Sequence, residues 1–459
     1  MTHFDIAVIG AGSGNFLMNR ALADKQFAVI EEGLFGGTCL NVGCIPTKMF
    51  VHAAEVADQV RDAARLGIDA NLAGVRWGDI RDRVFDRIDP YSASARQARR
   101  DGPNTTVYAG HARFTGDHTL LVATDAGEEE VSADTIVIAA GARATVPPEL
   151  ADVPFHTSDT VMRIDALPRT ATIIGGGFIA AEFAHILSGL GVEVTIVNRG
   201  PALLRRLDDD LRDAYTALAQ EQWTVHLGRT VASATSLDDP DRSGAVALDL
   251  DDGTRVETDL LLVATGRVPN SDRLGLEATG IEVHPDGRIK VDERGRTSVD
   301  GVLALGDISS PYQLKHVANH EARTIAHNLA NPDDQRSFDH RFVPSAVFTR
   351  PQIATVGLTE AAAREAGHDV VTSTRAYGDT AYGWALEDTT GLCKVIADRG
   401  TGLLLGAHVM GPDASTLIQP AIQALSFGLP APEMARGQYW IHPAMAEVLE
   451  NAVLGLRLR

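Results

Sequence analysis

The sequence predicts an α/β protein with two Rossmann-like dinucleotide-binding domains and a C-terminal α+β domain. Two observations support the first part of this prediction: a strand, a glycine-rich loop and a helix follow one another near residue 10 and again near residue 175. A third is that the segment after residue 335 lacks this pattern and contains short apolar runs typical of an antiparallel sheet. A chain of 459 residues is long enough for two to four domains, each with its own core.

The first nucleotide-binding pattern begins with a predicted strand at residues 4–9, followed by Gly10-Ala11-Gly12-Ser13-Gly14-Asn15 and a helical stretch to about residue 24. A second strand, residues 27–30, ends at Glu31. Glycines let a pyrophosphate approach the backbone at a helix N-terminus, and an acidic residue about 20 positions later accepts the ribose hydroxyls. Glu31 is at that distance, and it fits better than its neighbour Glu32 because it directly ends the strand.

One residue departs from the usual pattern of this loop. Asn15 stands where the third glycine or alanine is expected, which would loosen the packing of helix against strand. Gly14, immediately before it, is expected to compensate.

The second pattern consists of a strand at residues 171–174, a loop at 175–180, a helix at 181–190 and a strand at 192–197. The position that would bind the 2′-hydroxyl of NAD through a carboxylate is Asn198. Arginines follow at positions 199, 205 and 206, and arginines suit a 2′-phosphate. The sequence therefore favours NADPH over NADH.

Other apolar runs predict the remaining strands. Residues 136–141, 261–267 and 302–307 are each expected to be a strand that ends in small residues, and the last ends in Gly306-Asp307. In the C-terminal part the expected elements are strands at 346–349, 354–357, 391–397 and 403–410 and a helix at 418–427. Cys393, within one of these strands, is expected to be a small core residue.

Two of the three cysteines, Cys39 and Cys44, lie five positions apart just after the first nucleotide-binding pattern. A regular helix would separate them by roughly 8 to 9 Å, whereas a disulfide requires Cα atoms within about 7 Å. We therefore expect a distorted segment, which Gly43 permits, and a helix that starts near Pro46 with Cys44 at or beside its N-cap. A thiolate there is stabilised by the helix dipole, so the pair is predicted to form a redox-active disulfide. The spacing and the lack of further ligands argue against a metal site.

Composition excludes some classes of partner. A net charge of −20 argues against nucleic acids and anionic membranes, and no apolar run reaches 18 residues. A strand is predicted almost at the first residue, which leaves no room for a signal peptide and predicts a cytoplasmic protein. A disulfide in that reducing compartment is more often catalytic than structural.

His442-Pro443 is followed by Glu447, a spacing that fits a histidine acid or base oriented by a carboxylate. The alternative is a surface or capping histidine.

The order of these motifs resembles the flavoprotein pyridine nucleotide–disulfide reductases, the group that includes glutathione reductase and lipoamide dehydrogenase. The resemblance covers nearly the whole chain, and the cysteine motif is its most specific part. It implies an FAD-binding domain at 1–147, an NADPH-binding domain at 148–270, a central domain at 271–335 that completes the FAD site, and an interface domain at 336–459. The matching residues are Gly10, Gly12, Glu31, 36–48, 175–182, 264–270, Gly306, Asp307, His442, Pro443 and Glu447.

The resemblance also implies roles. Cys44 would be the thiol beside the flavin and Cys39 the thiol that attacks the substrate disulfide, while Lys48 and Glu182 would pair near the flavin. A homodimer is implied, in which His442, oriented by Glu447, reaches the partner's active site and protonates the departing thiol. Phe178 would be the gate for the nicotinamide. The cofactor-binding residues implied are Gly10, Gly12, Gly14, Glu31, Gly37, Thr38, Lys48, Gly141, Asp307, Gly175, Gly177, Phe178, Ala180, Arg199, Arg205, Gly266 and Arg267.

The implied reaction is reduction of a small-molecule disulfide: NADPH reduces FAD, FAD opens the Cys39–Cys44 disulfide, and the thiols reduce the substrate. Similarity within the family, at residues 12–15, 316–323, 382–385 and 435–443, favours mycothione, the disulfide of a cysteinyl pseudo-disaccharide thiol. The alternatives are a glutathione-type reductase and an NAD-dependent dihydrolipoamide dehydrogenase, the latter disfavoured by Asn198 and the arginines. A non-catalytic flavoprotein would tolerate loss of Cys39, Cys44 or His442, and all three are present.

Overall fold

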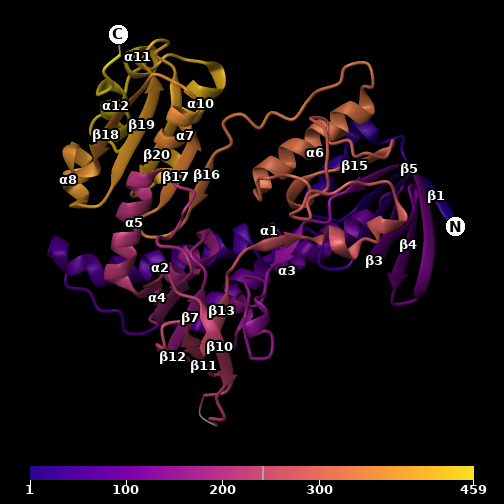
Figure 1. The fold of residues 1–459 in the computed structure, drawn as a ribbon, viewed down its shortest axis with the longest axis horizontal. Helices are drawn as coiled ribbons and strands as arrows, with labels where there is room; N and C mark the ends of the chain where they lie inside the picture. Colours follow the sequence, from indigo (N-terminus) through magenta and orange to yellow (C-terminus); the bar gives the residue numbers. More distant parts are fainter. Residues whose placement is uncertain (240–241, 459) are drawn as a thin grey trace.

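A computed structural model describes residues 1–239 and 242–458. Figure 1 shows three groups of strands, each with its own helices: an N-terminal group near the N label, a second group at the bottom, and a C-terminal group near the C label. The mixed α/β architecture predicted from the sequence is confirmed. Arg459, the last residue of the expected interface domain, lies outside the described residues. Within the described ranges, no helix is both long and apolar enough to cross a membrane.

The first sheet places the carboxyl ends of four parallel strands at one edge. Strand β1 lies between β2 and β5, and β15 joins the other side of β5, with Ile9 paired to both Ile30 and Ile138. The residues that follow these strands therefore meet at the edge where α/β proteins bind nucleotides. The strands are β1 (Thr2–Ile9), β2 (Phe27–Glu31), β3 (Thr105–Gly116), β4 (Thr119–Thr124), β5 (Gly127–Ile138) and β15 (Val302–Ala304).

The helical stretch expected up to residue 24 was predicted wrongly as one helix. It consists of two short 3₁₀ helices, Ser13–Leu17 and Arg20–Leu22. Asn19 between them has an extended backbone, and its side chain accepts a hydrogen bond from the Ala21 N–H, so it starts a new turn instead of continuing the first. The close packing expected at this loop comes from Gly14, where a Cβ would lie 2.7 Å from the Val8 side chain.

Four α-helices accompany the first sheet. Helices α1 and α2 carry the cysteines, α3 packs against both of them and against β3, and α6 follows β15 and packs against the first 3₁₀ helix. Their bounds are α1 (Gly37–Asn41), α2 (Cys44–Asp62), α3 (Trp77–Arg100) and α6 (Lys315–Ala330).

The second group has a four-stranded parallel sheet in the order β13-β7-β8-β9. A small antiparallel sheet of β10, β11 and β12 lies between β9 and β13 in the chain. The chain enters through β6 and leaves through β14, and these two strands pair with each other. The elements are β6 (Ala142–Ala144), β7 (Thr170–Ile174), α4 (Phe178–Gly189), β8 (Glu193–Asn198), α5 (Asp209–Gln222), β9 (Thr224–Leu227), β10 (Val231–Ser236), β11 (Val246–Leu250), β12 (Arg255–Thr258), β13 (Leu260–Val263) and β14 (Arg267–Pro269).

The C-terminal group is an antiparallel sheet in the order β16-β17-β20-β19-β18, covered by helices (Figure 1). The four predicted strands and the predicted helix are confirmed, and Cys393 is fully buried in this core. Strand β18 and several helices were not predicted, β18 because most of its residues are exposed or polar. The elements are β16 (Ser345–Val347), β17 (Ile353–Gly357), α7 (Glu360–Glu365), β18 (Val370–Ala376), α8 (Ala381–Leu386), β19 (Leu392–Asp398), β20 (Leu404–Met410), α9 (Ala414–Leu417), α10 (Gln419–Phe427), α11 (Ala431–Arg436) and α12 (Glu447–Leu454).

A buried lysine joins the second group to the C-terminal group. The Lys394 Nζ on β19 lies 2.8 Å from carboxylate oxygens of Asp208, Asp210 and Glu360, and the lysine side chain is only 3% exposed. Asp208 also caps α5 and accepts a hydrogen bond from the Glu360 N–H. Burial raises the pKa of Asp208, but the Glu360 N–H and Lys394 outweigh it and hold that pKa below its usual value.

We expect Lys394→Met to lower the free energy of unfolding by about 3–5 kcal/mol, because it leaves the buried Asp208 carboxylate without its cation. Urea unfolding followed by circular dichroism measures the loss. Lys290→Met is the matched control, since the exposed Lys290–Glu282 pair should contribute less than about 1 kcal/mol. Equal effects of the two substitutions would contradict this assignment.

Candidate active site

A cleft of about 2850 Å³ is shared by the glycine loops of the two nucleotide-binding patterns and the cysteine segment. Most of the predicted site residues line it, and the start of α6 contributes residues that the sequence analysis did not identify. The predicted residues in the cleft are Gly10, Gly12, Glu31, Gly37, Thr38, Cys39, Cys44, Lys48, Gly141, Gly175, Gly177, Phe178, Glu182, Arg199, Arg205, Gly266, Arg267 and Asp307.

Four predicted residues do not line this cleft: Gly14, Ala180, His442 and Glu447. Gly14 packs against β1, as described above, and Ala180 is buried within the core around α4. Both residues therefore pack on the side of their loops that faces the protein core, where they cannot contact a ligand directly.

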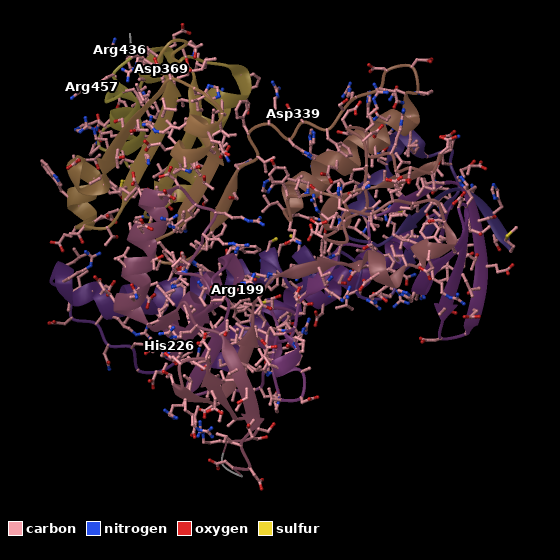
Figure 2. All side chains as sticks on the ribbon, viewed as in Figure 1. Arg199, His226, Asp339, Asp369, Arg436 and Arg457 are labelled. Carbon is pink, nitrogen blue, oxygen red and sulfur yellow. The ribbon has the colours of Figure 1, made fainter. Side chains whose placement is uncertain are left out.

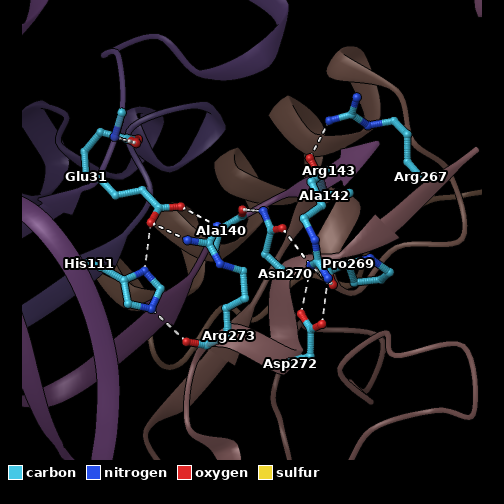
Figure 3. Close-up of polar contacts among 12 residues, drawn as sticks. Glu31, His111, Ala140, Ala142, Arg143, Arg267, Pro269, Asn270, Asp272 and Arg273 are labelled. Carbon is cyan, nitrogen blue, oxygen red and sulfur yellow. Dashed lines mark hydrogen bonds and ion pairs between the residues drawn. The ribbon is translucent and has the colours of Figure 1, made fainter. Parts of the chain in front are cut away.

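Glu31 is positioned by the glycine loop itself. Its two carboxylate oxygens accept hydrogen bonds from the Ala11 N–H at 2.7 Å and the Gly33 N–H at 2.8 Å. Burial raises the pKa of this carboxyl, and those two N–H groups oppose the rise. Glu32 instead forms ion pairs with Arg273 and His111 in the region shown in Figure 3, which leaves Glu31 as the acid at the end of β2.

The first glycine loop and the start of α1 approach each other too closely for side chains. Gly37 has φ +65°, and a Cβ on it would lie 2.7 Å from the Cα of Gly12. A Cβ on Gly10 would lie 2.3 Å from the Ala139 carbonyl oxygen. The result is a cradle of bare backbone at the sheet edge, which fits the pyrophosphate of FAD.

Asp307 is held at the same edge by its neighbours. Glu321 accepts a hydrogen bond from the Gly306 N–H at 2.7 Å, which fixes the turn after β15. Burial raises the pKa of Asp307, while Arg267 opposes that rise, and Arg267 also donates to the Ala142 carbonyl. A carboxylate in this position is suited to accept hydrogen bonds from the hydroxyl groups of the ribityl chain of FAD.

A polar network that the sequence analysis missed ties the crossing strands β6 and β14 together (Figure 3). Arg143 makes two hydrogen bonds to Asp272, at 2.8 and 2.7 Å, and Asn270 donates to the Ala140 carbonyl at 2.8 Å. These contacts fix the junction between the first and second groups, so both glycine loops open into one cleft. Nothing in the residue spacing signals this pairing, because it depends on strands far apart in the chain.

The two cysteines lie on either side of a break between helices. Cys39 is in α1, Cys44 is the first residue of α2, and Gly43 before it would place a Cβ only 2.8 Å from the Thr38 carbonyl oxygen. The expected distortion at Gly43 and the expected helix start are confirmed. The structure holds both residues as thiols in hydrogen-bond contact, so the disulfide itself stays a prediction.

The two thiols differ in pKa. The pKa of Cys44 is lowered to about 7, mainly by the hydrogen bond from Cys39. Burial raises this pKa, and the positive charge of Lys48 opposes that rise. The same hydrogen bond, together with burial, raises the pKa of Cys39. Cys44 is therefore the thiolate of the pair, at the positive end of α2.

Lys48 lies one turn after Cys44 on α2. Its Nζ is 2.7 Å from Glu182 Oε2 on α4, and the other Glu182 oxygen accepts a hydrogen bond from the Phe348 N–H at 2.9 Å. Nζ also lies 4.4 Å from the centre of the Phe348 ring. Through these contacts the Lys48–Glu182 pair and Phe348 connect the first, second and C-terminal groups beside the cysteines.

The second glycine loop begins α4 and exposes Phe178, whose surface is 44% accessible, to the cleft. Asn198 donates hydrogen bonds to the carbonyls of Gly200 and Ala202, at 3.1 and 2.9 Å. It therefore holds the loop that carries Arg199, which Figure 2 labels near the middle of the molecule. Arg199, Arg205 and Arg206 all line the cleft.

His442 and Glu447 form the expected pair, with 2.7 Å between Nδ1 and Oε1. The hydrogen bond to His442 holds the pKa of Glu447 below its usual value. The histidine side chain is 70% exposed and lies outside its own chain's cleft. Within the described ranges, no group of three or more His, Cys, Asp or Glu residues is arranged to hold a metal ion.

Comparison with known proteins identifies the family of this chain. Residues 4–322 match the family model "Pyridine nucleotide-disulphide oxidoreductase" and residues 343–453 match the dimerisation domain of the same family. The chain is 56% identical to mycothione reductase of Mycobacterium tuberculosis, with 100% of both chains covered. It is 34% identical to glutathione reductase of Burkholderia cepacia, with 97% of each chain covered, and 32% identical to dihydrolipoyl dehydrogenase of Halobacterium salinarum, with 98% of this chain and 96% of the relative covered.

Among solved structures, the HOCl-induced flavoprotein disulfide reductase RclA from Escherichia coli, as its Cu(II) complex, superposes with a TM-score of 0.87. The two chains are 28% identical, and 99% of each is covered. The two family models match the N-terminal and C-terminal parts of the chain in succession. The chain is therefore an oxidoreductase of the FAD-dependent pyridine nucleotide–disulphide oxidoreductase family.

Proposed function

We propose that this protein reduces mycothione to two molecules of mycothiol at the expense of NADPH. The observation that carries the proposal is the thiol pair at the start of α2, in a cleft shared by two nucleotide-binding loops. The substrate is proposed from the 56% identity to a mycothione reductase over the full length of both chains.

In this proposal the first glycine loop, Glu31, the Gly12–Gly37 cradle and Asp307 hold FAD. Bound FAD supplies the capacity to take a hydride from NADPH and to return an electron pair to the cysteine disulfide. Lys48 and Glu182 fix the walls of the cleft beside the cysteines. The remaining chemistry belongs to side chains of this chain.

The substrate step is a thiol–disulfide exchange. The Cys39 thiolate attacks one sulfur of the substrate disulfide, so a Cys39–substrate disulfide forms, the original sulfur–sulfur bond breaks and one thiolate leaves. His442 donates a proton to that leaving thiolate. Cys44 then attacks Cys39, which releases the second thiol and restores the Cys39–Cys44 disulfide.

His442 can act in this way only from a second copy of the chain, because it lies outside its own cleft. The match to a dimerisation domain and the exposed apolar side chains of Phe427, Tyr439 and Ile441 within it support a homodimer. A two-fold axis would give each cleft the partner's His442.

We propose the division 1–147, 148–270, 271–335 and 336–459 for the FAD, NADPH, central and interface domains. Strand β15, from the third segment, completes the sheet of the first, which supports a central segment that belongs with the FAD site. We also infer a cytosolic location, because the cysteine pair needs a reducing compartment in which to act.

Arg205→Ala is expected to reduce kcat/KM for NADPH by roughly 10- to 100-fold, because a charge-assisted hydrogen bond to a 2′-phosphate contributes about 1.5–3 kcal/mol. The kcat/KM for NADH should change less than about threefold, since NADH lacks that phosphate. Initial rates with each nucleotide at saturating disulfide provide the test. Arg255→Ala, in an exposed ion pair on β12, is the control. Equal losses with both nucleotides would contradict the assigned contact.

The substrate proposal is tested by NADPH oxidation with mycothione, glutathione disulfide and lipoamide in parallel. A preference for mycothione in kcat/KM is expected. A preference for either of the other two would refute mycothione as the substrate, while loss of all three activities would refute the reductase function.

A further inference from the structure

Asn15, which departs from the usual pattern of the first glycine loop, is held by a side chain from α3. Its Oδ1 accepts a hydrogen bond from Arg99 Nε at 3.2 Å, and its backbone carbonyl accepts a second from the Arg99 guanidinium at 3.1 Å. Its Nδ2 donates to the Ala11 carbonyl. Because a guanidinium group can only donate, the amide oxygen of Asn15 must face Arg99 and the amide nitrogen is left to bond Ala11.

Ala11 connects the parts of the loop that are predicted to hold a nucleotide. Its N–H donates to Glu31 Oε2 at 2.7 Å, and its carbonyl also accepts a hydrogen bond from the Gly36 N–H at 3.0 Å. Gly36 directly precedes Gly37, which packs against Gly12 to form the cradle of bare backbone. A side chain that fixes Ala11 therefore fixes both the acid at the end of β2 and one wall of the cradle.

The backbone that follows the glycine loop gives it little support of its own. The helix there is a 3₁₀ helix of five residues, Ser13–Leu17, without a side-chain cap. The hydrogen bond from the Asn15 N–H to the Gly12 carbonyl is 3.4 Å long, which is at the weak end of the range. The usual dinucleotide-binding unit has a full α-helix at this point, and its N-terminus binds the pyrophosphate. The Asn15 side chain supplies contacts that such a helix would otherwise provide.

Arg99 differs from its neighbour at the same helix end. Arg99 and Arg100 both lie in the last turn of α3, where the helix dipole favours a positive charge. Arg100 is exposed, whereas Arg99 is half-buried and makes the two hydrogen bonds to Asn15. Burial lowers the pKa of Arg99, which means that its charge is less well solvated than that of a surface arginine. The helix dipole explains a basic residue at this end of α3, but it does not explain the inward position of Arg99.

We propose that Arg99 is a positioning residue for FAD, which acts through Asn15 to hold the Ala11 turn in the conformation that binds the pyrophosphate and the ribose. The proposal rests on the proposed function, because it takes the first glycine loop as the FAD site. Arg99 from α3 replaces, by way of one amide side chain, the support that a regular α-helix gives to this loop in other dinucleotide-binding units.

The test measures how fast the purified holoenzyme releases FAD after dilution, followed by the rise in flavin fluorescence, without nucleotide or disulfide substrate. The variants are Arg99→Met, Asn15→Ala and the double variant. Arg100→Met is the matched control, since it removes a cation from the same helix end and leaves the contacts of Asn15 intact. The Kd for NADP⁺ on the same preparations reports on the second glycine loop.

Arg99→Met is expected to release FAD roughly tenfold faster than the parent, which is the effect of losing a hydrogen bond to a charged group. Asn15→Ala should have an effect of similar size. The double variant should release FAD within about threefold of the faster single variant, because both substitutions break the same chain of contacts. Arg100→Met and the Kd for NADP⁺ should stay within about threefold of the parent, because they do not involve those contacts. If Arg99→Met does not fold, Arg99→Gln replaces it.

An Arg99 variant that releases FAD at the parental rate overturns the proposal. So does a double variant whose effect equals the product of the two single effects, since Arg99 would then act independently of Asn15. An equal effect of Arg100→Met would assign the result to the charge at the helix end, and equal weakening of FAD and NADP⁺ would assign it to a general loosening of the fold. A parent protein that retains no FAD would refute the flavin site of the proposed function itself, whereas failure of the mycothione assay leaves the FAD measurement readable.

Discussion

Replacing Cys44 by serine is expected to reduce NADPH-dependent disulfide turnover by roughly 10³-fold or more, as removal of a covalent catalytic group does in other enzymes. The mixed disulfide on Cys39 would have no neighbouring thiolate to resolve it, because Cys44 is the thiol in contact with Cys39. The hydroxyl of serine is not a comparable nucleophile. Steady-state turnover with mycothione and NADPH measures the loss.

The same variant should trap its substrate. Mass spectrometry of Cys44→Ser mixed with mycothione is expected to show one added thiol on Cys39. Cys393→Ala is the matched control, because that thiol is buried in the C-terminal core and lies outside the cleft. Turnover within tenfold of the parent for Cys44→Ser would refute the roles assigned to the two cysteines.

His442→Ala is expected to lower kcat by roughly 10²- to 10⁴-fold, the range typical of a lost general acid or base. Glu447→Gln should have a smaller effect, because a glutamine can still accept the hydrogen bond from Nδ1 but no longer stabilises the protonated ring. The pH profile of kcat distinguishes the two variants. His3→Ala removes another exposed histidine that contacts a carboxylate, and it should retain activity.

Mixed dimers test whether His442 acts across the subunit interface. Cys44→Ser and His442→Ala are each expected to be nearly inactive alone. A dimer of one subunit of each kind contains one cleft with both an intact cysteine pair and an intact partner histidine, so activity should partly return. Failure of co-expressed, purified mixed dimers to recover activity would place the histidine outside the partner's site.

The local motifs could be predicted because each depends on neighbouring residues. Close backbone approach at Gly10 and Gly37 leaves room only for glycine, and the break at Gly43 follows from the crowding at the Thr38 carbonyl. Strand β13 and residues 6–9 of β1 are continuous apolar runs, as expected for buried parallel strands. Such features are visible in a short stretch of sequence.

Other features were not visible in apolar spacing or in contiguous motifs. The first helix became two 3₁₀ helices because the Asn19 side chain bonds the Ala21 N–H, a local competition that apolar spacing does not show. Strand β18 escaped prediction because it is an edge strand with a polar, exposed surface. The network around Arg143 and Asp272 forms only once β6 and β14 pair.

By itself, the sequence determined the family, the order of the nucleotide loops and the position of the cysteine pair, because these are written in contiguous residues with fixed backbone requirements. Only the tertiary structure decided which charges surround the sulfurs and that His442 faces outward from its own cleft. Lys48 and Glu182 meet beside Cys44 from separate helices, α2 and α4, and electrostatic effects depend on distance in space rather than distance along the chain.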